Sequence, residues 1–494
     1  MQQPQVPSWV PDAIFYQIFP DRFAQSPQVM KPRNLEPWDA APTFQGYKGG
    51  DLLGVIDHLD YLQDLGITAI YFNPIFQSAS NHRYHTHDYY QVDPLLGGNP
   101  AFYRLRDALH QRGMRFLLDG VFNHASRGNF YFNDILENGP QSPWIDWFTI
   151  QDWPIDAYGS DKPANYASWW GIKTVPRWNT EHPEVREYLM RVAEHWVREG
   201  IDGWRLDVPF EITASGFWQE FRQRVRAINP ETYIVGEVWG NASESLKGDQ
   251  YDGVMNYLFA ESAIQFAGQA HTQQELVSDM GYHPYPAIDA REYANKIDIL
   301  LAMNDWATNL GQYNLLDSHD TARLRTIFSN DEAAVRLATL LLSTFPGPPS
   351  IFYGDEIGLT GGKDPACRAA FPWDHPETWD HGAFAYHKHL IALRRTHAAL
   401  RTGSYQRLWP HPDDPSEAAQ AVYAFARHLG NETIIVAANA SDTHQHIALP
   451  VADIRLAERT VTMLIGDAAW MAREGDHLEV RLPPRIACMV QVGD

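Results

Sequence analysis

Eight short runs of Val, Ile, Leu and aromatic residues recur along the first three quarters of the chain, and longer amphipathic stretches separate them. Because these runs are almost continuously apolar, they are typical of parallel strands buried on both faces. They are IFYQIF at 14–19, AIYFNP at 69–74, RFLLDGVF at 115–122, GWRLDV at 203–208, YIVGEVW at 233–239, GVMNY at 253–257, YNLLDS at 313–318 and SIFYGDEI at 350–357. Eight strands that alternate with helices predict an α/β fold, a (β/α)8 TIM barrel. An open, doubly wound sheet is the competing fold, but it accounts for eight units less well.

The clearest helical pattern lies at 182–200, HPEVREYLMRVAEHWVREG. Its apolar side chains repeat at helical spacing and form one stripe, at Val185, Leu189, Val192, Trp196 and Val197. Pro183 lies in the first turn, where its missing N–H costs no hydrogen bond, and Gly200 follows the predicted end. We therefore expect a helix that packs this stripe against the sheet.

Two stretches interrupt the alternation. About 55 residues at 126–180, rich in Trp, Pro and Asn, are too many for a plain loop after the third strand. From 402 onward, AVYAFARHL and ETIIVAANA flank a Gly-Asn pair, and LEVRLP follows, which is typical of antiparallel strands. We predict a barrel formed by 1–125 and 181–400, a small excursion domain at 126–180 and a C-terminal antiparallel β-sandwich at 401–494.

Composition and charge exclude several kinds of partner. The formal net charge is −22 and no basic cluster occurs, which argues against nucleic acid and anionic membranes. The longest apolar runs, such as LATLLLSTF at 337–345, are far shorter than the roughly 20 residues of a membrane span. The N-terminus does not resemble a secretory signal, and Cys367 and Cys488 have neither zinc nor redox spacing, so we expect a cytoplasmic protein.

Polar residues gather at the carboxyl ends of the predicted strands, where barrel enzymes place their active sites. They are Asp119, Asn123 and His124 at the third strand, Arg205 and Asp207 at the fourth, Glu237 at the fifth, and His319 and Asp320 at the seventh. One such carboxylate is usually a structural ion pair or a helix cap. Asp207, Glu237 and Asp320 at three of these strand ends, accompanied by an Arg and two His, predict a catalytic site.

Asp207 and Glu237 end neighbouring strands, and neighbouring strands lie about 4.8 Å apart. A carboxyl pair about 5–5.5 Å apart suits a retaining glycosidase, whereas an inverting enzyme needs a wider gap for water. Arg205 lies two residues before Asp207, on the same face of the strand, and we expect its charge to keep Asp207 ionised. We expect repulsion from Asp207 and Asp320 to favour the protonated form of Glu237.

Four short segments carry these residues: DGVFNH at 119–124, GWRLDV at 203–208, GEVW at 236–239 and LLDSHD at 315–320. In order and spacing they resemble the signature regions of glycoside hydrolase family 13, the α-amylase family. Further segments are similar to its neopullulanase, cyclomaltodextrinase and maltogenic amylase branch, including YQIFPDRF at 16–23, NHRYHTHDYYQVDP at 81–94 and GGKDPACRAAFPWD at 361–374. The resemblance extends from about residue 12 to the C-terminus.

The resemblance implies a role for each matching residue. Asp207 would form the covalent glucosyl intermediate, Glu237 would act as acid and then base, and Asp320 would favour the distorted sugar at the cleavage site. Tyr84 would stack beneath this sugar ring and His124 would bind its primary hydroxyl. The residues expected to bind the α-glucan substrate are Tyr84, His124, Arg205, His319, Asp88 and Trp239.

The resemblance also raises the question of calcium. The calcium loop of the branch follows a DRFANG-type segment and uses Asn and Asp side chains. Here the segment reads DRFAQSPQVMKP at 21–32 and lacks the carboxylate and amide ligands that a hard cation needs. We expect calcium to be lost at this loop and no cofactor to be required. A second site of the family uses the residue at Asn123, which is therefore the candidate metal ligand.

Two further departures from the branch affect assembly and specificity. Many members carry an N-terminal β-domain that helps to form a dimer, whereas this chain begins almost at its first strand. We therefore expect a monomer, or a dimer that is not built on such a domain. The segment after Asp207 usually reads VANE, and here it reads VPFE at 208–211, so we expect altered subsites.

The leading hypothesis is a retaining glycoside hydrolase that cleaves α-1,4-glucosidic bonds in maltooligosaccharides, cyclodextrins or pullulan by double displacement. A transglycosylase with the same catalytic residues is the nearest alternative, because a sugar hydroxyl can replace water. Activity on α-1,6 bonds is less expected, since that branch usually shows a QPDLN-like motif where this chain has VPRWN at 175–179. A non-catalytic carbohydrate-binding protein is a remote alternative, because the chain keeps all three essential carboxylates.

Overall fold

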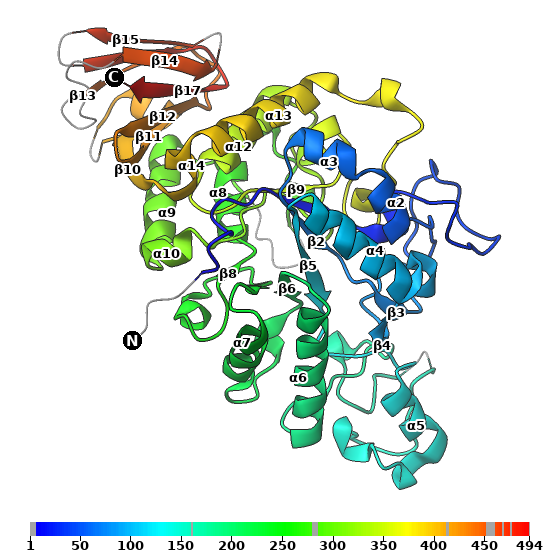
Figure 1. The fold of residues 1–494 in the computed structure, drawn as a ribbon. Coiled ribbons are helices and arrows are strands. Elements are labelled where there is room, and N and C mark those ends of the chain that lie inside the picture. The colour runs from blue at the N-terminus through cyan, green and yellow to red at the C-terminus, as the bar shows by residue number, and fades with distance from the viewer. Residues whose placement is uncertain are drawn as a thin grey trace.

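The computed structural model describes residues 6–159, 162–278, 285–411, 414–450, 460–466, 469–474 and 477–493. Its largest part is a barrel of parallel strands with helices around it (Figure 1). An excursion that contains helix α5 (Phe130–Asn138) lies at one end, and a separate group of antiparallel strands follows near the C-terminus (Figure 1). Residues 1–5 at the start of the predicted barrel and residue 494 at the end of the predicted β-sandwich lie outside the described residues.

The barrel sheet contains seven strands, each within a run predicted from the sequence. Their order is β8-β7-β6-β5-β2-β1-β9, and all pairs in it are parallel. The strands are β1 (Phe15–Ile18), β2 (Ala69–Phe72), β5 (Arg115–Gly120), β6 (Gly203–Leu206), β7 (Tyr233–Gly236), β8 (Gly253–Val254) and β9 (Ser350–Phe352). Nearly every residue in them is buried, as expected for strands covered on both faces.

The predicted strand at 313–318 closes the barrel, but with only two paired residues. Tyr313 forms a parallel bridge with Met255 and Asn314 forms one with Pro349, so the segment joins the two edges of the sheet. The prediction of a six-residue strand here is too long. Residues 315–318 are buried but unpaired, because the chain turns here and the N–H of Ser318 donates to the side-chain hydroxyl of Thr321 (2.9 Å). Closure through this segment excludes the open, doubly wound alternative.

Helices connect the strands and cover the outside of the barrel (Figure 1). The longer ones are α2 (Leu52–Asp57), α3 (Leu59–Leu65), α4 (Gly98–Gln111), α6 (Pro183–Arg198), α7 (Phe217–Ile228), α8 (Tyr257–Gly268), α9 (Ala290–Ala302), α12 (Glu332–Thr344) and α13 (His381–Thr396). Short turns of helix are α1 (Pro20–Phe23), α10 (Trp306–Asn309), α11 (Leu324–Ile327), α14 (Ala398–Thr402) and α15 (Glu417–Ala421).

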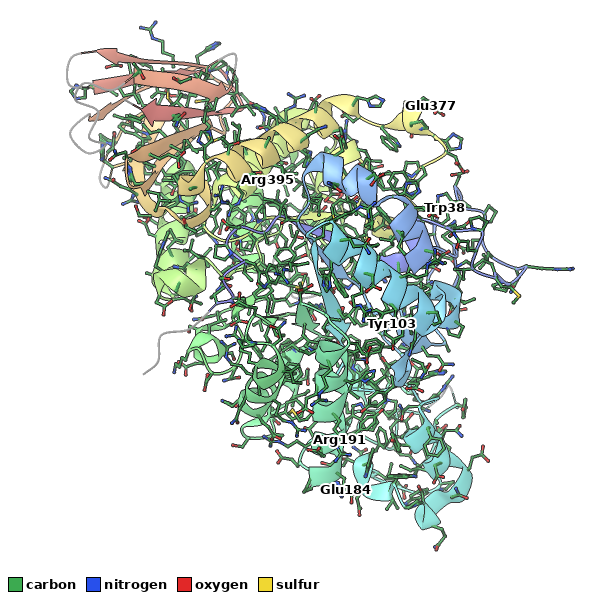
Figure 2. All side chains as sticks on the ribbon, in the orientation of Figure 1. Trp38, Tyr103, Glu184, Arg191, Glu377 and Arg395 are labelled. Carbon is green, nitrogen blue, oxygen red and sulfur yellow. The ribbon has the colours of Figure 1, made fainter. Side chains whose placement is uncertain are left out.

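Helix α6 confirms the pattern predicted at 182–200. All five residues of the predicted apolar stripe are buried, and Pro183 is its first residue. The chain leaves the helix at Gly200, whose φ of +98° suits glycine. Glu184 and Arg191 lie on the exposed side of the same helix (Figure 2). Helix α6 therefore has the amphipathic character that attaches a helix to a barrel.

The excursion is tied to the barrel by short antiparallel contacts. It lies beside the hairpin of β3 (Phe76–Ser78) and β4 (Thr86–Val92), where the main-chain N–H of Ser126 donates to the carbonyl of Thr86 (2.9 Å). Bridges pair His124 with Arg177 and Ser168 with Pro176. These contacts hold the return segment of the excursion beside the carboxyl ends of the barrel strands.

The C-terminal strands form two antiparallel sheets. The larger has the order β10-β11-β12-β17-β14 and the smaller β13-β16-β15. Their bounds are β10 (Ser404–Trp409), β11 (Val422–Leu429), β12 (Glu432–Asn439), β13 (Gln445–Pro450), β14 (Thr460–Ile465), β15 (Trp470–Glu474), β16 (His477–Leu482) and β17 (Ile486–Gly493). The hairpin predicted around the Gly-Asn pair is β11–β12, and the two sheets share one apolar core, which confirms the β-sandwich.

The larger sheet is buried on both faces because its side chains alternate between two cores. On β11, Ala424 and Ala426 face the smaller sheet, whereas Tyr423 and Phe425 pack on the core that includes helices α8, α9 and α12. The buried guanidinium of Arg427 then donates to the carbonyl of Thr344 at the end of α12 (2.7 Å). The sandwich is thus packed directly against the barrel.

Within the described residues, no helix has both the length and the apolar character needed to cross a membrane.

Candidate active site

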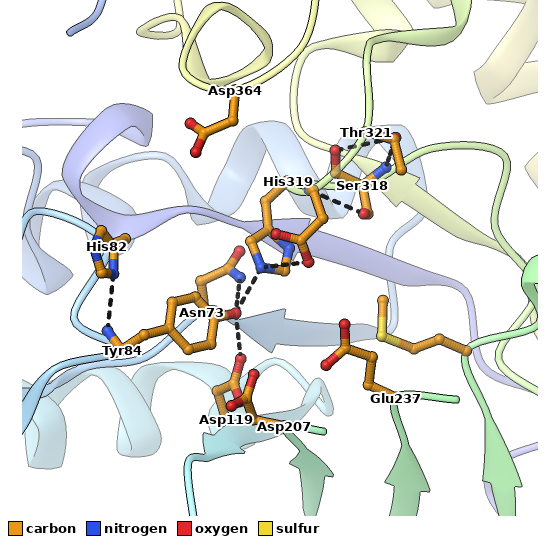
Figure 3. Close-up of polar contacts among 12 residues, drawn as sticks. Asn73, His82, Tyr84, Asp119, Asp207, Glu237, Ser318, His319, Thr321 and Asp364 are labelled. Atoms are coloured by element: carbon orange, nitrogen blue, oxygen red, sulfur yellow. Dashed lines mark hydrogen bonds and ion pairs between the residues drawn. The ribbon is translucent and has the colours of Figure 1, made fainter. Parts of the chain in front are cut away.

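Asp207 and Glu237 lie side by side at the carboxyl edge of the barrel sheet. Leu206 of β6 is in register with Gly236 of β7, and each carboxylate follows directly after these residues. The main-chain N–H of Glu237 donates to the carbonyl of Leu206 (2.9 Å), so the register continues into the site. Figure 3 shows both carboxylates directed into the same space. This is the neighbouring arrangement that the sequence predicts.

One buried guanidinium group, that of Arg205, contacts both of these carboxylates and a third one. Its Nη1 lies 3.1 Å from Asp207 Oδ1 and 3.0 Å from Asp119 Oδ2, and its Nη2 lies 2.9 Å from Glu237 Oε2. The hydroxyl groups of Tyr71 (2.6 Å) and Tyr84 (2.9 Å) also donate to Asp119. Asp119 is therefore a support that fixes Arg205 beneath the catalytic pair, as charge-assisted hydrogen bonds do.

The charge prediction for Asp207 needs a correction. Burial raises the pKa of Asp207 well above its usual range, and the lowering by Arg205 does not reverse this direction. Burial and the charge of Glu237 likewise raise the pKa of Asp320 to about 7. For Asp207 the physical reason is that desolvation of the buried carboxylate outweighs the attraction of Arg205, and the charges of Glu237, Asp119 and Asp320 add to the rise. The cluster therefore tends to retain a proton near neutral pH.

Asp320 and His319 form the opposite side of the site. The amide nitrogen of Gln17 donates to His319 Nδ1 (2.8 Å), which leaves the proton of the neutral ring on Nε2. Burial and the nearby Arg368 and Arg205 lower the pKa of His319 well below its usual range, so the ring is neutral. Its Nε2–H faces Asp320 Oδ2 (3.1 Å), and Arg368 Nη2 lies 3.3 Å from Asp320 Oδ1.

Tyr84 and His124 present aromatic faces to the same space. The Tyr84 ring is parallel to the His319 ring at 5.6 Å, and its hydroxyl group is engaged by Asp119 and His319 Nε2. Its ring face is consequently the part that remains for a ligand. Burial lowers the pKa of His124 to about 3, which keeps the imidazole neutral. A neutral ring can exchange hydrogen bonds with a sugar hydroxyl.

A cavity of about 930 Å³ opens above these groups. Six of the predicted site residues line it: Tyr84, His124, Asp207, Glu237, Trp239 and Asp320. Arg205, His319 and Asn123 contact lining residues. Asp88 does neither, because its carboxylate accepts the N–H of Tyr90 (2.8 Å) within β4. Trp239 lines the cavity, and its indole N–H donates to Glu237 Oε1 (3.2 Å). The lining residues are His82, Tyr84, His85, His124, Trp169, Trp170, Ile172, Val175, Asp207, Val208, Phe210, Glu237, Val238, Trp239, Gly240, Asp320, Asp364 and Arg368.

A sharp turn after Asp207 brings the backbone to Glu237. Val208 has φ of +36°, a left-handed conformation that is strained for a β-branched residue. Its N–H donates to Glu237 Oε2 (3.0 Å). The turn thus links the two carboxylate-bearing strand ends and places Phe210 in the lining of the cavity.

Sequence reasoning did not assign Asp364 or Arg368, although both line the cavity. Arg368 donates from Nε to the carbonyl of His319 (2.7 Å) and pairs through Nη1 with Asp364 (3.1 Å). Both residues lie in a loop after β9 and at no strand end, so the barrel pattern carries no signal for them. The segment GGKDPACR at 361–368, similar to the branch, was the available signal.

The pattern of matches to known proteins agrees with this geometry. Residues 17–403 match the family described as "Alpha amylase, catalytic domain", and residues 415–488 match "Maltogenic Amylase, C-terminal domain". The chain belongs to the alpha-amylase family. The predicted family, the barrel fold and the status of an enzyme rather than a non-catalytic binding protein are confirmed at this level.

Three similar proteins of the family cover most of the chain. The cyclomaltodextrinase of Geobacillus thermopakistaniensis (strain MAS1) is 42% identical over 97% of this chain and 77% of its own. Neopullulanase 2 of Thermoactinomyces vulgaris is 42% identical over 90% of this chain and 72% of its own. The native structure of the Nostoc punctiforme debranching enzyme is 53% identical, with a TM-score of 0.90 and 100% coverage of both chains.

The residues at the implied calcium loop of this family do not fit a hard cation. Lys31 places its ammonium nitrogen 3.1 Å from Oδ2 of the fully buried Asp51 and 2.5 Å from the carbonyl oxygen of Leu95. The ammonium group of Lys31 thus neutralises the carboxylate of Asp51, which faces this loop. Two neighbouring buried carboxylates have arginine partners, with Arg22 on Asp21 (2.8 Å) and Arg83 on Asp93 (3.2 Å).

The second metal candidate, Asn123, is buried, and its amide nitrogen lies 3.3 Å from His124 Nδ1. Its main-chain carbonyl accepts the N–H of Trp178 (3.1 Å). Across the part of the chain that the structure describes, no group of three or more His, Cys, Asp or Glu side chains could hold a metal ion. The role of Asn123 as a ligand stays a prediction from the family resemblance.

Replacing Asp320 by Asn should stabilise the folded enzyme at alkaline pH. The pKa of Asp320 is about 7 when folded and near 3.8 when unfolded, so folding free energy is lost as the pH rises from about 4 to about 7, and Asn avoids this loss. We expect the melting temperature of Asp320→Asn to exceed that of the wild type by about 1–3 °C at pH 8. The gain should shrink towards pH 5, where Asp320 is protonated in the folded state. A gain of equal size at both pH values, or a loss at pH 8, would contradict the assignment.

Replacing Lys31 by Met should show how much the ion pair of Lys31 with Asp51 contributes to stability. Breaking a buried ion pair leaves one charge without its partner, so we expect a loss of about 2–4 kcal/mol in the free energy of unfolding. Lys247→Met, which removes an exposed pair with Glu244, is the matched control and should cost under about 0.5 kcal/mol. Chelator should leave the wild-type melting temperature unchanged. A large fall with chelator would show that a metal, and not Lys31, neutralises Asp51.

Proposed function

We propose that the chain is a retaining glycoside hydrolase that cleaves α-1,4-glucosidic bonds by double displacement. The observation that carries this proposal is the carboxylate pair itself: Asp207 and Glu237 follow residues in register on adjacent strands and share the guanidinium of Arg205. Carboxyl groups on adjacent strands suit the short separation of a retaining enzyme, whereas an inverting enzyme needs a wider gap for water.

In the first step, the carboxylate of Asp207 attacks the anomeric carbon and the bond to the leaving sugar oxygen breaks. Glu237 gives its proton to that oxygen. In the second step, water attacks the same carbon, Glu237 accepts the proton of the water, and the bond to Asp207 breaks. Positive charge that develops on the sugar favours the ionised form of Asp207, although burial alone raises its pKa.

The remaining residues would hold the sugar at the cleavage site. Asp320, with His319 Nε2–H and Arg368 as neighbours, would accept hydrogen bonds from ring hydroxyls. Tyr84 would lie against the ring, and neutral His124 would bind its primary hydroxyl. Asp88 would act only by supporting the backbone of β4, because its carboxylate accepts the main-chain N–H of Tyr90. The net charge of the ionised cluster would favour an oxocarbenium-like sugar in the transition state.

Short α-glucans are the proposed substrates: maltooligosaccharides, cyclodextrins or pullulan. The names of the cyclomaltodextrinase and neopullulanase relatives support this class. A second candidate is cleavage of α-1,6 branches, which the 53% identical debranching enzyme favours despite the VPRWN motif at 175–179. Transfer to a sugar acceptor by the same carboxylates is the other alternative.

The location and assembly stay part of the proposal. Both cysteines, Cys367 and Cys488, are free and buried, which supports a reducing cytoplasm. A monomer, or a dimer built without an N-terminal β-domain, is the proposed assembly. The limits of the excursion at 126–180 and of the C-terminal domain at 401–494 likewise stay as proposed.

Chromatography of products from maltoheptaose, β-cyclodextrin and pullulan tests this function. We expect shorter maltooligosaccharides from the first two, and panose from pullulan, because only α-1,4 cleavage leaves the α-1,6 bond intact. Maltotriose from pullulan would favour debranching, and longer oligosaccharides as first products would favour transfer. Asp207→Asn, nearly identical in shape, is the control and should give no product. Absence of product from the wild type on all three substrates would contradict the hydrolase.

A further inference from the structure

The two carboxylate oxygens of Glu237 have different surroundings. Oε2 lies 2.9 Å from Nη2 of the buried Arg205, and it accepts the main-chain N–H of Val208 (3.0 Å). Oε1 accepts the indole N–H of Trp239 (3.2 Å). A guanidinium group, a main-chain N–H and an indole N–H are all donors, and none of them can accept a hydrogen bond. These contacts restrict where Glu237 can hold a proton.

Oε1 is the oxygen that can hold this proton. A proton on Oε2 would face the guanidinium group of Arg205 and the N–H of Val208, and both repel it. A protonated carboxyl group keeps acceptor capacity, so Oε1 can carry the proton and still accept the indole N–H of Trp239. The O–H bond must then point away from the indole.

The contact with Trp239 also fixes how the carboxyl group of Glu237 is turned. The last torsion of a glutamate side chain is broad, so contacts must set it. Contacts at Oε2 alone would leave the group free to pivot about that oxygen, whereas the indole N–H at Oε1 prevents this rotation. A general acid must lie within about 2.6–3.2 Å of the atom that it protonates, so a small rotation impairs the transfer.

Trp239 is held in turn by Tyr257, the first residue of α8. The two rings are stacked, with 3.7 Å between their centroids and 5° between their planes. Tyr257 is buried and does not line the catalytic cavity. Its hydroxyl group lies 3.1 Å from Oγ of Ser318, which accepts the main-chain N–H of Asp320 (3.2 Å). Tyr257 therefore connects the indole beside Glu237 with the strand end that carries Asp320.

The start of α8 is itself anchored to the segment that closes the barrel. The side-chain amide of Asn256 donates to Oδ1 of Asn314 (2.8 Å), and its main-chain N–H donates to the carbonyl of Tyr313 (2.8 Å). The same segment continues to Ser318, so both the backbone and the hydroxyl group of Tyr257 are fixed to it. The ring of Tyr257 is thus a rigid support for Trp239.

We propose that Glu237 carries its catalytic proton on Oε1, and that Trp239, supported by Tyr257, is the positioning residue that directs this proton to the leaving oxygen. The inference rests on the proposed function, because it takes Glu237 as the acid. In the first step the O–H bond at Oε1 breaks and its proton passes to the glycosidic oxygen. That oxygen keeps the electron pair of its bond to the anomeric carbon, which bonds to Asp207. In the second step the attacking water returns a proton to Oε1.

Two aryl α-maltosides of similar shape separate this role from sugar binding. 4-Nitrophenol leaves with little help from an acid, whereas 4-methylphenol needs the proton of Glu237, and α-maltosyl fluoride needs none. Trp239→Phe keeps a ring that can stack on Tyr257 but removes the N–H. We expect it to lower kcat/KM for the 4-methylphenyl substrate about tenfold. The values for the 4-nitrophenyl substrate and the fluoride should stay within about twofold of the wild type.

Matched variants exclude other causes. Trp379→Phe removes another partly buried indole N–H, which donates to the carbonyl of Pro372 (3.0 Å) outside the cavity lining, and it should leave all three substrates unaffected. Tyr257→Leu removes the stacked ring and should reproduce the selective loss of Trp239→Phe. Tyr257→Phe keeps this ring and should retain most of the activity on the 4-methylphenyl substrate.

Equal losses of Trp239→Phe on both aryl substrates would overturn the proposal, because Trp239 would then act by binding the leaving group. Unchanged kinetics in both Trp239→Phe and Tyr257→Leu would also overturn it. Failure of the proposed function has a different signature, given by Glu237→Gln. This variant should lose the 4-methylphenyl substrate far more than the fluoride, and equal losses on these two substrates would contradict Glu237 as the acid itself.

Discussion

The guanidinium group of Arg205 is the interaction on which the site depends. It is buried at the carboxyl end of the barrel and contacts Asp119, Asp207 and Glu237 within 3.1 Å. Removing it would leave three neighbouring carboxylates in a medium of low dielectric, which is costly for each of them. Barrel closure, strand register and burial all serve to hold these four groups together.

Burial and neighbouring like charges explain the pKa pattern of the site, against the attraction of Arg205. Asp207 and Asp320 are buried among like charges, so their pKa values are raised and the cluster keeps a proton near neutral pH. Acid catalysis needs such a proton, and nucleophilic attack needs an ionised Asp207. In the proposed mechanism the two demands are compatible, because positive charge arrives with the transition state, close to Asp207, while the proton leaves with the departing sugar.

Much of the barrel and the three carboxylates could be predicted from the sequence, because parallel strands are recognisable by continuous apolar runs and catalytic groups follow their ends. The strand at 313–318 was predicted too long, since apolar content alone does not show that the chain turns after Asn314 and that the N–H of Ser318 bonds to Thr321. Arg205 does lower the pKa of Asp207, but the expectation that it keeps Asp207 ionised failed, because spacing along one strand does not reveal the burial and the charges of Glu237 and Asp119 that raise this pKa.

Other parts of the site have no local signal. Arg368 and Trp170 lie in loops, and their approach to Asp320 and to the cavity rim depends on long-range packing. Lys31 illustrates the same limit: the sequence shows that calcium ligands are missing, but only the fold shows an ammonium group on Asp51. Loops are the segments that vary most within a fold, so the specificity of this enzyme is concentrated where prediction is weakest.

Covalent trapping tests the central claim most directly. A 5-fluoroglucosyl fluoride forms the intermediate through its good leaving group, while the electron-withdrawing 5-fluoro group slows the hydrolysis of that intermediate. The account predicts that peptide mass mapping finds the fluoroglucosyl group on Asp207, and that Asp207→Asn is not labelled. A label on Glu237 or Asp320, or turnover that releases product of inverted configuration without any label, would contradict it.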